Sequence, residues 1–343
     1  MKLGIIARSD NTGLGNQTLE LTKMLSPDKI LLIDSSPFNG NPQFPKRYSG
    51  YNVMPVSGFP SDQQVINFLE GLDVVISCEI FYNDNFIKHA KRHNVKTILQ
   101  YNHEFLETGM TDLPDILLAP STWNIDKVIA EYGHKSRVVH LPPPTRPELF
   151  SGAREENAKN HRRILHVAGR IAHKDRNGTE DVVEMLKYSK ADYELVVTTQ
   201  TKFSKDVNDP RLIVKRDNTE NREDLFSGYD AIVLPRRYAG LCLPMNEALM
   251  SGIPVFMTDI SPNNDILPDK WLVNSTMVET TMAKRRIEVY HVGLKALASK
   301  IDWYMGLQDK SAEKAEAYEI GRSRFSPEVL KDKYLDLIHS LMD

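Results

Sequence analysis

The chain has 343 residues, of which 41% are hydrophobic and 26% are charged, a globular composition long enough for two domains. Its formal net charge is −3 and its basic residues are scattered, which argues against a general affinity for nucleic acid or for an anionic membrane. Its two cysteines, Cys78 and Cys242, lie in apolar segments, which argues against a disulfide framework. The sequence shows no signal peptide and no apolar run of about 18 residues, so we expect a cytoplasmic protein without a transmembrane span.

The first half of the sequence alternates short apolar runs with segments of helical periodicity. The apolar runs are KLGIIAR, KILLID, DVVISC, VKTILQYN, DILLAPS and RVVHLPP. Runs that are apolar on both faces suit parallel strands covered by helices on both sides of a sheet. We therefore expect a Rossmann-like N-terminal domain over residues 1–150.

A proline-rich and then charged stretch, residues 141–163, predicts a linker to a second series of strands. The new apolar runs are RILHVAGR, YELVVTT, RLIVKRD, DAIVLPR and IPVFMTD. We expect a second Rossmann-like domain over residues 160–325, with a pattern that turns helical from about Lys284 to the end of the chain. Ligands of such sheets bind beyond the carboxyl ends of the strands, so the loops there are the candidate sites.

The loop after the first strand is rich in glycine. In RSDNTGLGNQTLELTKML, Gly13 and Gly15 let the backbone come close to a ligand, or simply form a tight turn. Thr18 stands where the dinucleotide-binding pattern G-x-G-x-x-G has its third glycine. This difference disfavours an NAD-dependent dehydrogenase, one of the alternatives for such a fold.

Polar residues also follow a later strand of the first half, in TILQYNHEF. His103 lies at the end of this strand, where its imidazole has either a structural or a functional role. The neighbouring Asn102 and Glu104 are candidates for contacts with a second substrate.

Three cations follow the first strand of the second half, in HVAGRIAHKDRNGTED. Arg170, Lys174 and Arg176 form either a basic surface turn or an anion site, because a guanidinium stays charged and can donate two hydrogen bonds to an anionic oxygen. Glu180 and Asp181 suit the first turn of the next helix, and their charge makes that helix N-terminus a poor anion site.

The stretch YAGLCLPMNEALMSGIPVFMTD predicts a loop, a short helix and a buried strand. Pro244 suits the first helical turn and Gly252 suits the helix end. The first turn has unpaired backbone N–H groups and no carboxylate before Glu247, so it can accept phosphate oxygens. Glu247, one turn further, is placed to bind a vicinal diol such as that of a ribose.

These residues resemble a family of enzymes. In the retaining, glycogen-synthase-like GT-B glycosyltransferases the second domain carries E-G-F-G-L-P-x-x-E-A followed by G-x-P-V, and AGLCLPMNEALMSGIPV matches its G, L-P, E-A and G-x-P-V. The first glutamate of the family pattern, which touches the donor sugar, falls on Ala239. The segments N-T-G-L-G and D-R-N-G-T also resemble uncharacterised bacterial and phage glycosyltransferases.

The resemblance implies a fold and a set of site residues. The fold is GT-B: two Rossmann-like domains with a cleft between them, and a terminal helix, residues 326–343, that crosses back to the first domain. Glu247 would bind the donor ribose, and Arg170 and Lys174 would neutralise the diphosphate, with Arg176 as a competing candidate for the second cation. The remaining implied donor and acceptor contacts are Gly13, Gly15, Asn16, His103, Gly169, Gly240, Leu241, Cys242 and Leu243.

The same resemblance implies the reaction. We expect transfer of a sugar from a nucleoside-diphosphate sugar with retention of configuration, without a metal, since the chain has no D-x-D pair, and without a resident cofactor. The sequence leaves the acceptor open among small glycosides, lipids, proteins and, for a phage protein, hydroxylated DNA bases. It also leaves open a nucleotide-sugar epimerase or hydrolase and a non-catalytic nucleotide-binding protein.

Overall fold

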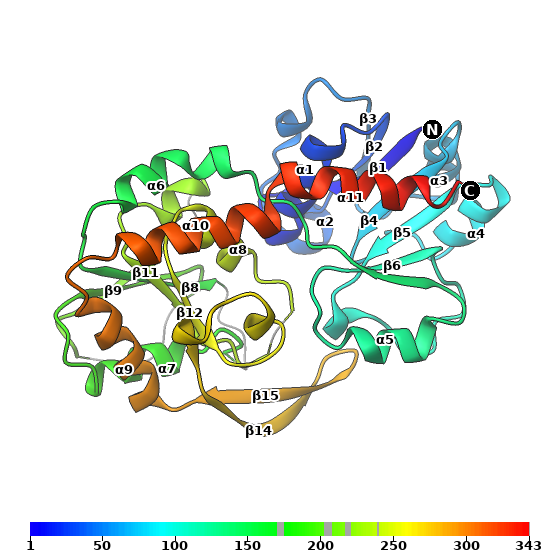
Figure 1. Cartoon of the computed structure of the whole chain (residues 1–343). Helices are drawn as coiled ribbons and strands as arrows, with labels where there is room; N and C mark the ends of the chain where they lie inside the picture. The colour runs from blue at the N-terminus through cyan, green and yellow to red at the C-terminus, as the bar shows by residue number, and fades with distance from the viewer. Residues whose placement is uncertain (170–174, 202–207, 217–220, 239, 343) are drawn as a thin grey trace. The chain divides into compact units, whose positions relative to one another are not determined.

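The structure is a computed structural model that describes residues 1–342 apart from 170–174, 202–207, 217–220 and 239. The chain divides into two compact units (Figure 1). Unit 1 comprises residues 1–144, 283–285 and the segment from 327 onward, and unit 2 comprises residues 145–282 and 286–326. Each unit holds its own parallel sheet, so the prediction of two Rossmann-like α/β domains is confirmed.

Unit 1 is built on a seven-stranded parallel sheet in the order β3-β2-β1-β4-β5-β6-β7. Side chains of α3, α4 and α5 pack on one face, and those of α1 and α11 on the other. The chain moves outward from β1 through β2 to β3, then returns to β4 on the other side of β1, which creates a switch point at the carboxyl ends of β1 and β4. The elements are β1 (Leu3–Arg8), α1 (Gly13–Leu25), β2 (Lys29–Asp34), α2 (Ser36–Asn39), β3 (Val53–Ser57), α3 (Asp62–Leu69), β4 (Val74–Cys78), α4 (Phe86–Arg92), β5 (Lys96–Gln100), β6 (Ile116–Ala119), α5 (Ile125–Tyr132), β7 (Arg137–His140) and α11 (Pro327–His339).

Unit 2 is built on a six-stranded parallel sheet in the order β10-β9-β8-β11-β12-β13. Its helices and strands share one apolar core in which Trp271 is fully buried. The elements are α6 (Ser151–Asn157), β8 (Arg163–Gly169), α7 (Thr179–Glu184), β9 (Glu194–Thr199), β10 (Leu212–Arg216), β11 (Ala231–Leu234), α8 (Leu243–Met250), β12 (Val255–Thr258), β13 (Leu272–Val273), β14 (Ser275–Met282), β15 (Arg286–Val292), α9 (Leu294–Met305) and α10 (Ser311–Phe325).

The segment after β13 corrects one prediction. We expected helix from about Lys284, but β14 and β15 form an antiparallel hairpin, and helix begins only at α9. In β15 the buried Ile287 and Val289 flank the exposed Glu288, an alternation typical of a strand with one covered face. Helical periodicity begins only after Gly293.

The last helix, α11, belongs to unit 1. Leu330, Tyr334 and Ile338 are buried in the core that α1 covers, and the Tyr334 hydroxyl donates a hydrogen bond to the Pro142 carbonyl at 3.0 Å. None of the helices in the described part of the chain is both long and apolar enough to span a bilayer.

Candidate functional site

The segment predicted as loop, helix and strand has that structure in unit 2. The loop after β11 leads into α8, which begins at Leu243, carries Pro244 in its first turn and ends before Gly252. Gly252 has a φ of +68°, a left-handed conformation that only glycine adopts without strain. Because α8 follows the end of β11, which runs parallel to β12, α8 begins at the carboxyl edge of the sheet. Ligands of such sheets bind at this edge.

The first turn of α8 has backbone N–H groups available for a ligand. The N–H groups of Met245 and Asn246 donate to the Cys242 carbonyl at 3.0 and 3.3 Å. Those of Cys242 and Leu243 donate to no other described residue, and the turn carries no acidic side chain. An anionic oxygen placed here would gain both hydrogen bonds and the favourable end of the helix dipole.

Glu247 is nearly buried, with 6% of its side chain exposed, and forms an ion pair with the Nε of Arg222. Arg222 is the residue before a short 3₁₀ turn, Glu223–Phe226. An ionised carboxylate only accepts hydrogen bonds, so it suits the two hydroxyls of a diol. Arg222 therefore holds the predicted diol-binding carboxylate in place, a role that the sequence did not reveal.

Asn246, beside Glu247, is 1% exposed, and neither its amide oxygen nor its amide nitrogen has a hydrogen-bond partner among the described residues. A buried amide without partners costs about 1–3 kcal/mol, and most buried polar atoms of native proteins have a hydrogen-bond partner. Asn246 is therefore a second polar residue of α8 with capacity for a ligand.

The carboxyl end of β8 is bulged between Val167 and Gly169, and Gly169 has a φ of +60°. A β-carbon at Gly169 would meet no atom within 4 Å, so the backbone angle, not the space, favours glycine here. Arg170 and Lys174, the predicted diphosphate cations, lie outside the described residues. Bulges of this kind commonly redirect the chain beside a site.

Arg176 lies against the loop after β11. Its guanidinium is 5.7 Å from the centroid of the Tyr238 ring, and its carbonyl accepts a hydrogen bond from the Arg237 N–H at 2.9 Å. The loops after β8 and β11 therefore meet at the same edge of the sheet, and Arg176 is next to the segment that leads to α8.

Arg237 is the centre of a partly buried charge cluster at this edge. One of its terminal nitrogens is 3.6 Å from a carboxylate oxygen of Asp175 and 3.6 Å from one of Asp181. Asp175 also accepts the N–H groups of Thr179 and Glu180, so a carboxylate already occupies the N-terminus of α7. Burial raises the pKa of Asp181, although Arg237 opposes this shift. The expectation that this helix N-terminus would not bind an anion is consistent with that arrangement.

Another arginine supports the loop before α8. Arg236 is 3% exposed, and its guanidinium donates to the Leu241 carbonyl at 3.1 Å. Gly240 and Cys242 on either side of Leu241 are buried. The predicted phosphate loop is thus tied to the end of β11 by a residue that the motif does not include.

In unit 1, the loop between β1 and α1 is organised by Asp10, which is fully buried. Its carboxylate accepts hydrogen bonds from the hydroxyls of Thr12 and Ser35, both at 2.6 Å, and pairs with Arg8. Burial alone would raise the pKa of Asp10, but the hydrogen bonds from Ser35 and Thr12 and the charge of Arg8 together lower it.

Packing within unit 1 explains one of the two glycines in this loop. Gly13 is the exposed first residue of α1, whereas a β-carbon at Gly15 would overlap the carbonyl and carboxylate of Asp10. The Asn16 side chain donates to the Asn11 carbonyl at 2.9 Å and accepts a hydrogen bond from Arg47 at 2.5 Å. Gly15 thus allows the helix to pack on Asp10, and Asn16 is held by Asn11 of its own loop and by Arg47 of the 3₁₀ turn Pro45–Tyr48.

His103 follows β5, as predicted, and is 5% exposed. Its ring lies edge-on to Trp123 with centroids 5.2 Å apart, and its Nδ1 has no hydrogen-bond partner among the described residues. Burial, reinforced by the charges of Arg285 and Lys127, lowers the pKa of His103 from 6.5 to about 4. The imidazole is therefore neutral at pH 7 and can exchange hydrogen bonds with a neutral ligand.

Further polar side chains lie close to His103 in the sequence or pair with its neighbours. The Asn102 amide donates to the Glu79 carboxylate at 2.5 Å, and Glu79, directly after β4, has a φ of +66°. Such a backbone angle in a residue other than glycine costs about 1–3 kcal/mol and is found mainly at functional sites. Glu104 is buried, and its carbonyl accepts the Lys284 N–H at 3.0 Å.

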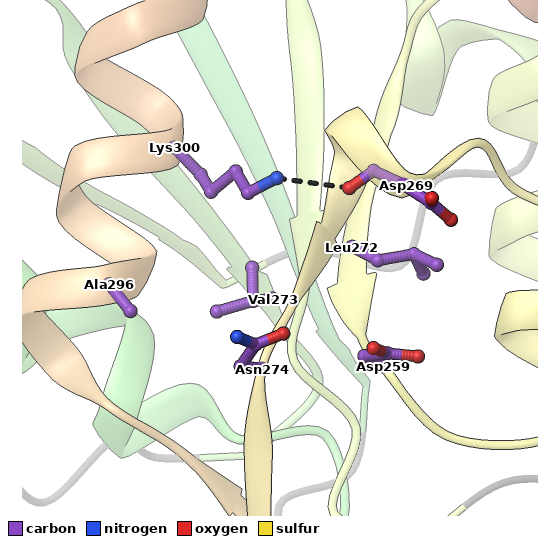
Figure 2. A pocket seen from close by; sticks show the side chains of 7 residues that line it. All are labelled: Asp259, Asp269, Leu272, Val273, Asn274, Ala296 and Lys300. Carbon is purple, nitrogen blue, oxygen red and sulfur yellow. Dashed lines mark hydrogen bonds between the residues drawn. The ribbon is translucent and has the colours of Figure 1, made fainter.

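A pocket of about 350 Å³ in unit 2 lies next to β12, β13 and α9 (Figure 2). It is lined by Asp259, Asp269, Leu272, Val273, Asn274, Ala296 and Lys300. The Lys300 ammonium donates to the carbonyls of Asp269 and Lys270 at 3.0 and 3.1 Å. Two carboxylates line this pocket, and its lysine already donates to backbone carbonyls. The start of α8 is therefore the better binding site for a diphosphate.

No family model matches the sequence, and no curated protein matches it. Solved structures do share its fold. HepE of Anabaena, crystallised with UDP and glucose, aligns with a TM-score of 0.71 and 11% identity over 99% of this chain and 100% of that chain. A glycosyltransferase of Rickettsia africae aligns with a TM-score of 0.66 and 12% identity over 100% and 98%. The sucrose-phosphate synthase of Thermosynechococcus elongatus aligns with a TM-score of 0.63 and 12% identity over 100% and 99%. The chain therefore has the GT-B fold that the motifs predicted.

Proposed function

We propose that this protein is a glycosyltransferase that moves a sugar from a nucleoside-diphosphate sugar to a hydroxyl acceptor. One observation carries the proposal: available N–H groups at the start of α8 are followed, one turn later, by the nearly buried carboxylate of Glu247 at the carboxyl edge of the unit 2 sheet. A nucleoside diphosphate presents a phosphate anion, which suits the N–H groups, and a ribose diol, which suits the carboxylate. HepE, which shares the fold, was crystallised with UDP, so uridine nucleotides are the first donors to test.

The donor contacts follow from the chemistry of each group. The N–H groups of Cys242 and Leu243 bind a phosphate oxygen, while Glu247 accepts hydrogen bonds from the ribose hydroxyls. Arg170 and Lys174, assigned from the sequence, supply positive charge to the diphosphate as it leaves. With amides and cations available for this charge, the scheme requires neither a metal nor a resident cofactor.

We propose that transfer proceeds with retention of configuration. The acceptor oxygen attacks the anomeric carbon from the face on which the diphosphate departs. The bond between that carbon and the phosphate oxygen breaks with its electron pair going to the diphosphate, and the acceptor proton passes to a phosphate oxygen. No protein base is needed. In unit 1, His103 is neutral at pH 7 and is a candidate for a hydrogen bond to a substrate hydroxyl.

The test is donor binding and turnover with UDP-glucose and UDP-galactose. Glu247→Gln should weaken binding of the nucleotide sugar about 10–100-fold, the value of a hydrogen bond to a charged group. The matched control is Glu319→Gln, which removes an exposed carboxylate of α10 that pairs with Arg322. Calorimetry measures binding, and chromatography of product from labelled donor separates transfer from hydrolysis and epimerisation.

The proposal fails if neither nucleotide sugar nor UDP binds to the wild type, or if Glu247→Gln and Glu319→Gln bind donor equally well. Conversion of the labelled donor to its epimer would show an epimerase instead. Binding without any turnover, tested with a broad panel of hydroxyl acceptors, would show a non-catalytic nucleotide-binding protein.

A further inference from the structure

Unit 1 carries a group of exposed aromatic rings that the assignments above do not use. Phe38 and Phe59 are 42% and 63% exposed, with ring centroids 5.2 Å apart. The ring of Tyr82, which is 4% exposed, supports both, at 6.4 Å from Phe38 and 6.2 Å from Phe59. We call these three residues the aromatic platform. Exposed phenylalanines in contact with one another leave apolar surface in water, which has a cost unless something covers it.

The aromatic platform lies at the ligand-binding edge of the unit 1 sheet. Phe38 is in α2, directly after β2, Phe59 follows β3, and Tyr82 follows β4. These positions flank the switch point between β1 and β4, where ligands of doubly wound sheets bind. Tyr82 has a φ of +60°, so the loop after β4 holds this ring at the expense of backbone strain.

Polar groups border the aromatic platform on the β1 side. The Arg8 guanidinium is 5.8 Å from the Phe38 ring centroid and pairs with the buried Asp10. The Nε of Arg8 is buried and has no hydrogen-bond partner among the described residues. The Asn39 amide, next to Phe38, donates to Asp10 at 3.2 Å. Flat apolar rings with hydrogen-bond donors at their margin match a ligand that has an apolar face and polar edges.

We propose that the aromatic platform binds the sugar ring of a carbohydrate acceptor, an inference that rests on the proposed glycosyltransferase function. A pyranose has a face of C–H groups, which packs on one or two aromatic rings, and a periphery of hydroxyls, which the polar margin can hydrogen-bond. The acceptor class is thus a glycoside.

Two other occupants fit less well. A lipid chain would need a longer apolar surface, whereas here the exposed rings end at the Arg8–Asp10 ion pair. A nucleic acid would stack its bases on such rings, but it needs several unpaired cations for its phosphates, and the guanidinium beside Phe38 is already paired with a carboxylate.

Saturation-transfer NMR on the full chain with UDP present tests the inference. The probes are the methyl glycosides of glucose, galactose, mannose, rhamnose and N-acetylglucosamine, together with octyl glucoside and thymidine. The variants are Phe38→Ala and Phe59→Ala, with Phe59→Tyr as the conservative change. Tyr188→Ala removes an aromatic ring of matching 42% exposure in unit 2 and is the control.

At least one methyl glycoside should show saturation on its ring C–H protons. Phe38→Ala or Phe59→Ala should weaken this binding about tenfold, the scale of one aromatic contact, whereas Phe59→Tyr and Tyr188→Ala should retain it. UDP-glucose binding, measured on the same samples, should be unchanged in all variants.

The inference is overturned if no methyl glycoside binds, if glycoside binding persists in both alanine variants, or if saturation falls only on the octyl chain or on thymidine. Donor binding keeps the two proposals apart. A protein that binds UDP-glucose but fails these glycoside tests refutes the carbohydrate acceptor alone, whereas a protein that does not bind UDP or UDP-glucose refutes the proposed function itself.

Discussion

Protonation of His103 should make the free energy of unfolding of unit 1 depend on pH, and the substitution His103→Asn should remove this dependence. The pKa of His103 is lowered from 6.5 to about 4 by burial, so the unfolded chain binds a proton at a pH where the folded chain does not. Stability from this group is fully present above pH 6.5 and is lost as the pH falls toward 4. Between pH 7.5 and 5.0 the difference amounts to about 2 kcal/mol, or about 4–8 °C in the melting temperature of a unit of this size.

The measurement compares urea unfolding of the wild type, His103→Asn and His134→Asn at the two pH values. His134 is an exposed histidine of the same unit and serves as the control. The wild type and His134→Asn should each lose about 2 kcal/mol more than His103→Asn on acidification. NMR titration of the His103 ring gives the pKa directly. A value near 6.5, or the same pH dependence in all three proteins, would refute the reasoning.

Three further substitutions test the packing described above. Gly15→Ala should destabilise unit 1 by about 1–3 kcal/mol because its β-carbon overlaps backbone. Gly152→Ala, in α6 and with no atom within 4 Å of its β-carbon, should not lower stability in the same urea assay. Asn246→Leu removes a buried amide without partners, so it should stabilise unit 2 by about 1–2 kcal/mol in thermal melts and weaken UDP binding. A melting temperature below that of the wild type would contradict the expected stabilisation. Lys314→Met should cost about 3–5 kcal/mol because it leaves the buried Asp230 carboxylate without its ammonium partner at 2.8 Å, and unfolding at wild-type urea concentrations would disprove that.

The parts of the fold that the sequence predicted correctly are those encoded by local patterns. Apolar runs of strand length gave the two parallel sheets, and Pro244 and Gly252 marked the first turn and the end of α8. The hairpin of β14 and β15 differs from the prediction of helix from about Lys284, since helical periodicity begins only after Gly293. Its alternation of Ile287 and Val289 with polar residues was present in the sequence and is the signal that finds it.

The partners of the candidate site residues could not be predicted, because they come from distant segments. Arg222, which pairs with Glu247, lies in a turn before β11 that carries no motif. The aromatic platform draws one ring from α2 and one from each of two loops, and only the order of strands in the sheet brings these segments together. A local pattern specifies a residue and its element, whereas the contacts that position its side chain depend on the tertiary fold.

Each unit has a buried polar side chain with unsatisfied hydrogen-bonding capacity at the edge of its sheet where ligands bind. Asn246 in α8 and His103 after β5 are both buried beside carboxyl ends of strands, and each has polar side-chain atoms without a partner among the described residues. A sequence selected for stability alone would replace such groups with apolar ones of similar volume, because the unpaired atoms cost free energy in the unliganded protein. A ligand that supplies the missing hydrogen bonds recovers that cost on binding. The same groups should therefore lower the stability of the unliganded protein and raise its affinity for ligand, so stability and binding should change in opposite directions when either side chain is made apolar.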